Sequence, residues 1–178
     1  TVDPEKDGVI RRVKAFVDTD EETYYHPALV TKRFLLNNED EFQRWLNKIP
    51  VDRENRFWIH HPGPYQSFER VSFNEIIDGV GTERDRELEA RFKDKIVLIG
   101  LTATGATDIT HTPFSTMDPG LVVQAGAMHT IFTEDFLIQS PEWAHLIILL
   151  ILALWISTMV KRTTPLKGLF ISIATMVI

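Results

Sequence analysis

The sequence predicts an α/β domain with a mostly parallel sheet covered by helices, followed by transmembrane helices. Stretches with helical periodicity alternate with short apolar stretches typical of strands, which favours the α/β class. The apolar run in DKIVLIG (94–100) suits a strand covered on both faces, as parallel strands are. Residues 143–160 hold no formally charged residue apart from His145, if it is protonated, and their length is at the lower end of a membrane span.

The first element is a strand over residues 8–17. This stretch is rich in apolar and β-branched residues and follows the turn signal Asp7-Gly8. Arg11 and Arg12 would then point to opposite faces of the strand. We therefore expect solvated or salt-bridged arginines rather than an anion site that both share.

Two helices are predicted next. Pro27 can occupy the first turn of a helix that runs to Leu36. A second helix follows Asn38, which forms a capping box with Glu41. Both helices are expected to cover the sheet. The apolar residues that fall on one face of the second are Phe42, Trp45, Leu46 and Ile49.

The stretch RFWIHH (56–61) predicts a strand that ends at Pro-Gly-Pro. Its adjacent histidines, His60 and His61, alternate between the two faces. A zinc site needs three or four convergent ligands, and the chain has no cysteine to supply one. We therefore predict no metal site.

Two short helices are predicted between residues 72 and 92. Ser72 with Glu75 forms a capping box for the first, which ends at Gly79. Thr82 with Asp85 opens the second. The residues expected to form its buried stripe are Leu88 and Phe92.

The last helix of the domain is predicted to run to Thr133. Asp118 should cap its start and Pro119 should occupy its first position. Small residues at 125–127 allow close packing. The residues expected on its buried face are Leu121, Ala125, Met128 and Phe132.

The stretch GLTATGAT, which begins at Gly100, matches a phosphate-binding loop only in part. That template, G-x-x-x-x-G-K-[ST], follows a strand and opens a helix. Gly105 and Thr107 fit, but Ala106 occupies the lysine position, and Pro113 argues against an uninterrupted helix. We interpret the loop as non-hydrolytic, and we expect Gly100, Gly105 and Pro113 to serve turns or close backbone approach.

The charge pattern predicts how the chain crosses a membrane. Residues 143–160 form the predicted transmembrane helix, with a buried helix of a large soluble domain as the alternative. The basic loop 161–167 should face the cytoplasm, and residues 168–178 begin a second span. Residues 1–142 are then an extracytoplasmic domain whose amino-terminal part is missing. No secretory signal opens the chain, so we expect an upstream membrane helix.

Composition excludes some functions. The formal net charge is −6 and there is no cysteine, so disulfides cannot stabilise an extracytoplasmic domain. Mild acidity without a basic stripe argues against nucleic acid as a partner.

Four segments, in this order ahead of the apolar spans, resemble the type-two CHASE family. They are DGVIRRV, SFNEIIDG, FKDKIVLIGLTATGATDITHTPF and PGLVVQAGAMHTIF. The resemblance covers Asp7 to about Ile138. In it, Asp108 and Pro113 match a D…TP stretch, and Gly100 ends KIVLIG. Members of this family are extracytoplasmic sensory domains associated with cyclases and histidine kinases.

The resemblance implies a multi-pass receptor of the bacterial inner membrane, with this domain in the periplasm and an output domain in the cytoplasm. The expected output is a class III adenylate or guanylate cyclase; otherwise it is a histidine kinase, diguanylate cyclase or Ser/Thr kinase. That output, expected after Ile178, would use ATP or GTP with Mg²⁺, and we expect no cofactor in the present segment. A homodimer is also implied.

A ligand site is predicted where ligands of open α/β sheets bind, beyond the carboxyl ends of the strands. The free N–H groups of the helix that opens at Pro119 favour an anion there. The alternative is that these side chains only bond to neighbouring backbone. The predicted ligand-binding residues, for an unknown small-molecule or protein stimulus, are Thr102, Thr104, Thr107, Asp108 and His111.

Two other functions remain open from the sequence. One is a membrane-anchored interaction or dimerisation domain without a small ligand. The other is a membrane-anchored hydrolase, for which Asp108 and His111 could pair. No activated nucleophile accompanies them and no serine lies in a G-x-S-x-G elbow, so we assign no catalytic residue.

Overall fold

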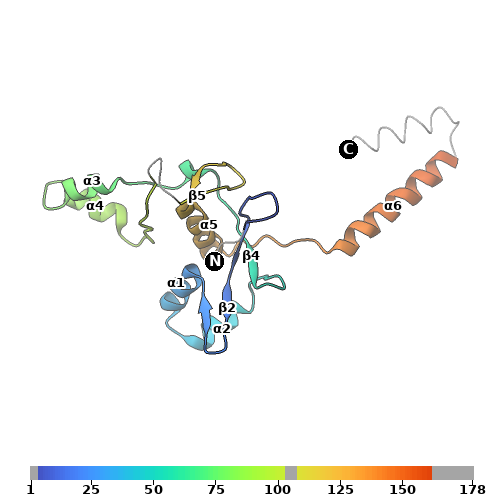
Figure 1. Cartoon of the computed structure of the whole chain (residues 1–178), viewed down its shortest axis with the longest axis horizontal. Coiled ribbons are helices and arrows are strands. Elements are labelled where there is room, and N and C mark those ends of the chain that lie inside the picture. Colours follow the sequence, from blue (N-terminus) through green and yellow to red (C-terminus); the bar gives the residue numbers. More distant parts are fainter. Residues whose placement is uncertain (1–3, 103–107, 162–178) are drawn as a thin grey trace. The chain divides into compact units, whose positions relative to one another are not determined.

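The computed structural model describes residues 4–102 and 108–161 (Figure 1). The chain divides into two units, Thr1–Ile138 and Gln139–Ile178. In chain order the elements are β1 (Arg12–Lys14), β2 (Phe16–Asp18), β3 (Thr23–Tyr25), α1 (Pro27–Leu36), α2 (Glu39–Leu46), β4 (Arg56–Trp58), the 3₁₀-helix η1 (Tyr65–Ser67), α3 (Phe73–Gly79), α4 (Asp85–Phe92), β5 (Ile109–Thr110), β6 (Asp118–Pro119), α5 (Gly120–Thr133) and α6 (Glu142–Lys161).

The described strands form three two-stranded antiparallel sheets, β1–β4, β2–β3 and β5–β6. The only parallel pairing among these residues is an isolated bridge between Val9 and His111. The mixture of helices and small sheets agrees with the predicted α/β class. The prediction of a mostly parallel sheet is not met in this part of the chain.

The strand predicted over residues 8–17 is divided at Ala15. Its N–H donates to Asn55 O over 2.7 Å, while its carbonyl accepts from His26 N over 2.8 Å. Hydrogen bonding therefore passes at Ala15 from the β4 side to the β3 side, so that one apolar run becomes β1 and β2. β3 was not predicted, because it is a short partner strand with little apolar pattern of its own.

The stretch KIVLIG forms no strand, which corrects the prediction of a central strand there. Leu98 is half-buried, and the other apolar side chains are exposed, from 45% at Ile96 to 81% at Ile99. A strand covered on both faces needs neighbours on each edge and each face. The described residues provide no neighbouring strands for KIVLIG, and apolar composition alone did not reveal this.

The first two helices agree with prediction. Pro27 begins α1, and the Nδ1 atom of the preceding His26 accepts from Ala28 N over 3.2 Å. Asn38 caps α2, where its side chain accepts from Glu41 N over 3.1 Å. Such caps satisfy N–H groups that a helix start leaves without partners.

The caps predicted for α3 and α4 are wrong. Ser72 makes no side-chain capping bond. Thr82 donates its hydroxyl to Gly79 O over 2.6 Å, so it closes the preceding turn, and α4 begins only at Asp85. Of the two residues predicted to be buried, Leu88 is buried and Phe92 is half-buried.

The start and the buried face of α5 also differ from prediction. Asp118 and Pro119 belong to β6, and the buried Asp118 carboxylate accepts from the Thr112 hydroxyl instead of capping the helix. The helix is apolar nearly all round, so its periodicity did not mark the inner face. The predicted residues Leu121, Ala125, Met128 and Phe132 are half-buried, whereas the buried residues are Val122, Val123, Gly126, Ala127, Thr130 and Ile131.

One core joins the sheets to the helices. Phe57 of β4 pairs with Val13 of β1, and both side chains are fully buried. α1 packs against α2 and α5. Further members of this cluster are Ile10, Ala15, Ala28, Leu29, Phe42, Trp45, Ile49, Ile59, Val123, Ala127 and Ile131.

Side chains from α1, α2 and the segment after β4 contact the chain where it leaves α5. The Glu134 carboxylate accepts from Trp45 Nε1 over 2.8 Å and from Lys32 Nζ over 3.1 Å. These bonds, that of Lys32 first, lower the pKa of Glu134. Next along the chain, Asp135 Oδ2 lies 2.8 Å from His60 Nδ1.

Gly126 marks a point of close packing in the middle of α5. A Cβ atom there would lie 2.8 Å from Ile59 Cγ2 and 2.9 Å from His61 Nδ1. Alanine normally stabilises a helix by about 1 kcal/mol relative to glycine. We expect Gly126→Ala instead to lower the free energy of unfolding by about 1–3 kcal/mol, because Ile59 and His61 must move. Urea denaturation measures this, and a gain in stability would contradict the packing described.

α6 has nearly the limits of the predicted transmembrane helix, residues 143–160. Its apolar side chains from Leu146 to Leu152, and those of Leu154 and Trp155, are exposed. Among the residues with described placement, no helix is both long enough and apolar enough to cross a membrane. The predicted second span at 168–178 and nearly all of the loop 161–167 lie outside the described residues.

Candidate functional site: a groove at the start of α5

The predicted ligand-binding residues divide into two groups. Thr104 and Thr107, like Gly105, lie outside the described residues. Thr102, Asp108 and His111 are described and exposed. Of these three, only Asp108 lines a groove.

The groove has a volume of about 290 Å³ and lies at the start of α5. Gly100 brings one wall close to the helix, since a Cβ atom there would lie 3.1 Å from Leu121 Cδ1. Among the glycines in the described part of the chain, those with positive φ are Gly8, Gly63 and Gly81. Gly100 therefore serves close approach rather than a left-handed turn. The lining residues are Ile99, Gly100, Leu101, Asp108, Thr110, Gly120, Leu121, Val123 and Gln124.

The Asp108 carboxylate lies against the first residue of α5. Gly120 N donates to Asp108 O over 2.9 Å, and a Cβ atom on Gly120 would overlap both carboxylate oxygens. The amino-terminal end of a helix carries a partial positive charge that favours a nearby anion. The chain's own Asp108 carboxylate therefore lies at this helix start, where the sequence predicted an anionic ligand, and the charge of the ligand stays a prediction.

Thr110 and Gln124 add polar groups to the groove, and sequence reasoning missed both. The Thr110 hydroxyl donates to Asp118 O over 3.3 Å, which leaves its oxygen free to accept. Gln124 is the polar residue within the apolar run of residues 121–128. That exception was the signal that could have identified it.

His111 has a backbone role. Its carbonyl accepts from Ile10 N over 2.8 Å, beside its bridge to Val9. Within residues 4–102 and 108–161, no hydrogen bond or ion pair joins its side chain to Asp108. Pro113 lies in an exposed bend, as a turn residue should.

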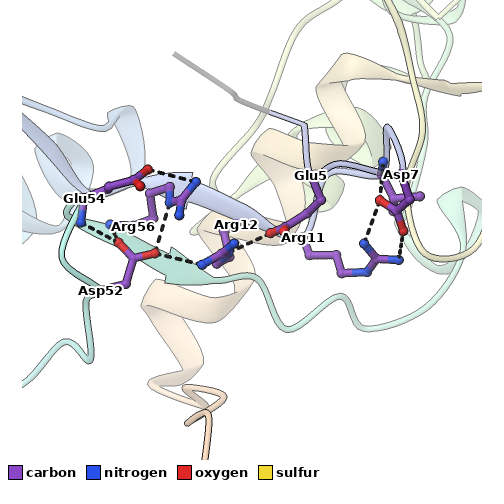
Figure 2. Close-up of polar contacts among 8 residues, drawn as sticks. Glu5, Asp7, Arg11, Arg12, Asp52, Glu54 and Arg56 are labelled. Atoms are coloured by element: carbon purple, nitrogen blue, oxygen red, sulfur yellow. Dashed lines mark hydrogen bonds and ion pairs between the residues drawn. The ribbon is translucent and has the colours of Figure 1, made fainter. Parts of the chain in front are cut away.

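Arg11 and Arg12 form ion pairs, as one of the two interpretations of the sequence held. Figure 2 shows Arg12 between two acids, with 2.7 Å to Glu5 and 2.9 Å to Asp52. Arg11 binds Asp7 over 2.8 Å and lowers the pKa of that carboxyl to about 2. The network fixes the segment before β1 to the turn before β4.

His61 is buried, with 8% of its surface exposed. Neither ring nitrogen has a hydrogen-bond partner among the described residues, and the ring meets Phe114 edge-on at 6.4 Å. Burial lowers the pKa of His61, although the charge of Asp118 acts in the opposite direction. Across the described ranges, no group of three or more histidine, aspartate or glutamate side chains could hold a metal ion.

Comparison with known proteins identifies the family. The model of the CHASE2 domain matches residues 1–159, which extends the resemblance over Asp7–Ile138 in both directions. No curated protein and no solved structure matches the chain. The chain belongs to the CHASE2 family, whose members are extracellular sensory domains of signalling receptors.

Proposed function

We propose that this chain is the input part of a bacterial transmembrane receptor and passes a stimulus to a cytoplasmic output domain. The family match over residues 1–159 carries this proposal. The groove at the start of α5 offers a place for the stimulus to act, since it combines apolar walls with a few polar groups, as ligand sites do.

The proposed output is a class III adenylate or guanylate cyclase, which would use ATP or GTP with Mg²⁺. Histidine kinase, diguanylate cyclase and Ser/Thr kinase outputs are the alternatives. The support for this proposal is that the family which the sequence resembles is associated with cyclases and histidine kinases. The test is to express the full-length receptor and assay cyclic AMP, cyclic GMP, cyclic diguanylate and protein phosphorylation. Output that does not change when the CHASE2 domain is deleted would contradict the sensory role.

We further propose that the receptor is a multi-pass protein of the inner membrane with residues 1–142 in the periplasm. The support is the apolar composition of residues 143–160 and the basic residues of the loop 161–167. The chain has no cysteine, so single cysteines can report topology cleanly. In intact cells Asp20→Cys should react with an impermeant maleimide, and Thr164→Cys should be protected. The reverse pattern would contradict this orientation.

A second candidate function is dimerisation. The exposed apolar stretch 96–101 favours it, because large exposed apolar patches often mark interfaces. If it joins two copies, Ile99→Asp should convert dimer to monomer in sedimentation experiments. Phe34→Asp is the control, since Phe34 is 80% exposed outside that stretch. An unchanged dimer in Ile99→Asp, or a monomeric wild type, would contradict this interface.

A further inference from the structure

We propose that the groove at the start of α5 binds a small organic amine, with its ammonium group at Asp108 and its apolar substituent against Ile99, Leu101 and Leu121. The inference rests on the proposed sensory function, whose input it specifies by chemical class. Four observations support it: charge, hydrogen-bonding groups, apolar walls and size.

The charge of the groove selects a cation. Asp108 is the one charged residue among those that line it. Within residues 4–102 and 108–161, no lysine, arginine or histidine forms an ion pair with this carboxylate. An anionic ligand would meet a carboxylate of its own sign at the helix start, whereas an ammonium group would gain a charge-assisted hydrogen bond.

The polar groups of the groove match the donors of an ammonium ion. A primary ammonium group has three N–H donors and no acceptor. Among the residues that line the groove, Asp108 has a carboxylate, Gln124 a side-chain carbonyl and Thr110 a hydroxyl oxygen. Neither Asp108 nor Gln124 makes a side-chain hydrogen bond within the described residues, so both are free to accept.

The remaining wall is apolar and exposed. Ile99 is 81% and Leu101 77% exposed, so a bound alkyl or aryl group would remove apolar surface from water. The volume of about 290 Å³ is at the lower limit for pockets that enclose small molecules. Glycine at 100 and at 120 keeps this space open, since a Cβ atom at either position would press on Leu121 or on the Asp108 carboxylate.

Three probes of equal length separate charge from apolar contact: n-butylammonium, 1-butanol and butyrate. The complete chain of 178 residues, in detergent micelles and with labelled isoleucine and leucine methyl groups, is titrated with each and followed by NMR. We expect n-butylammonium to give saturable shifts at Ile99, Leu101 and Leu121. Butanol should bind at least 10-fold more weakly, and butyrate should give no saturable shift.

Two variants test the residues. Asp108→Asn should weaken n-butylammonium binding at least 10-fold, and Gly120→Ala should do the same, because the added methyl group displaces the carboxylate. Asp20→Asn is the matched control: it removes the same charge from an exposed turn outside the groove and should leave binding unchanged. Unchanged signals from the methyl groups outside the groove will show that each variant is folded.

Two results with the wild-type chain would each overturn the proposal: equal affinity for butanol and n-butylammonium, or no saturable binding of n-butylammonium. Full affinity in Asp108→Asn would also overturn it. Failure of the sensory function gives a different result: the amine binds as expected, but the output of the full-length receptor does not respond. A receptor that still responds to its stimulus with Asp108→Asn would refute this site and leave the sensory function standing.

Discussion

Replacing Phe57 with alanine is expected to lower the free energy of unfolding by about 3–5 kcal/mol. Phe57 is fully buried, lies opposite Val13 in the β1–β4 pair and meets the His26 ring edge-on at 6.3 Å. Its loss leaves a cavity between the sheet and the helices that the surrounding side chains fill only in part. Urea denaturation at pH 7.5, followed by tryptophan fluorescence, measures the change.

Phe34→Ala is the matched control for this substitution. Phe34 has the same side chain but is 80% exposed on α1. We expect its replacement to change the free energy of unfolding by less than about 0.5 kcal/mol. A loss below about 1 kcal/mol in Phe57→Ala, or similar losses in the two variants, would contradict the core described.

Acidification from pH 7 to pH 4 is expected to cost the domain about 3 kcal/mol of stability through His26 alone. Burial lowers the pKa of His26 from 6.5 to about 4. The unfolded chain therefore binds a proton between these values that the folded domain does not. The stabilising contribution is complete above pH 6.5, decreases as the pH falls, and is lost near pH 4. Protonation would also block Nδ1, which caps α1 by accepting from Ala28 N.

His26→Asn separates this effect from other acid effects. Asparagine keeps a side-chain acceptor suited to the cap but does not titrate. Its free energy of unfolding should therefore fall by about 3 kcal/mol less than that of the wild type between pH 6.5 and pH 4. His61, whose pKa burial also lowers, leaves a decrease of the same sign in both proteins. Parallel pH profiles for the two proteins would show that His26 is not the titrating group.

Carboxylates act at lower pH and give a second test within the same titration. The hydrogen bond from Arg12 lowers the pKa of Glu5. A carboxyl with a lowered pKa contributes stability above its unfolded pKa, about 4.3 for glutamate, and loses it as the pH falls further. The loss from this network should therefore follow that from His26 as acid is added, and both variants should share it.

Local signals predicted the helices that depend on them. Pro27 and Asn38 act within one turn of the chain, and the structure has α1 and α2 where these residues place them. The errors at Thr82 and Asp118 have one cause. Each side chain has a partner that competes with capping, Gly79 O for Thr82 and the Thr112 hydroxyl for Asp118. A sequence pattern does not show which of two nearby partners a hydroxyl or carboxylate will choose.

Strand pairing was less predictable because it depends on residues far apart in the chain. The division of the first strand at Ala15 depends on Asn55 and His26. The stretch KIVLIG has the composition of an inner strand, yet burial requires partners that composition does not specify. The order of the four family-like segments therefore predicted the family correctly, but it did not predict how the strands pair.

The candidate site was predictable in part. The rule that ligands bind beyond strand ends led to Asp108, which does line the groove, although the strand on which that argument depended does not form. The sequence did not show that Thr110, Gln124 and Gly120 lie together with Gly100, because their proximity arises from the way residues 99–101 lie against α5. The sequence argument for an anion at this helix start did not take in the Asp108 carboxylate, since the approach of Asp108 to Gly120 is a contact across twelve positions.

The bonds from Lys32 and Trp45 to Glu134 restrict the movement of the backbone where the chain leaves the domain. If the residues after α5 were flexible and unbonded, a small rotation of α1 or α2 would not change the position of the chain that follows. Because Glu134 is bonded to both helices, we expect such a rotation to displace the backbone that follows α5.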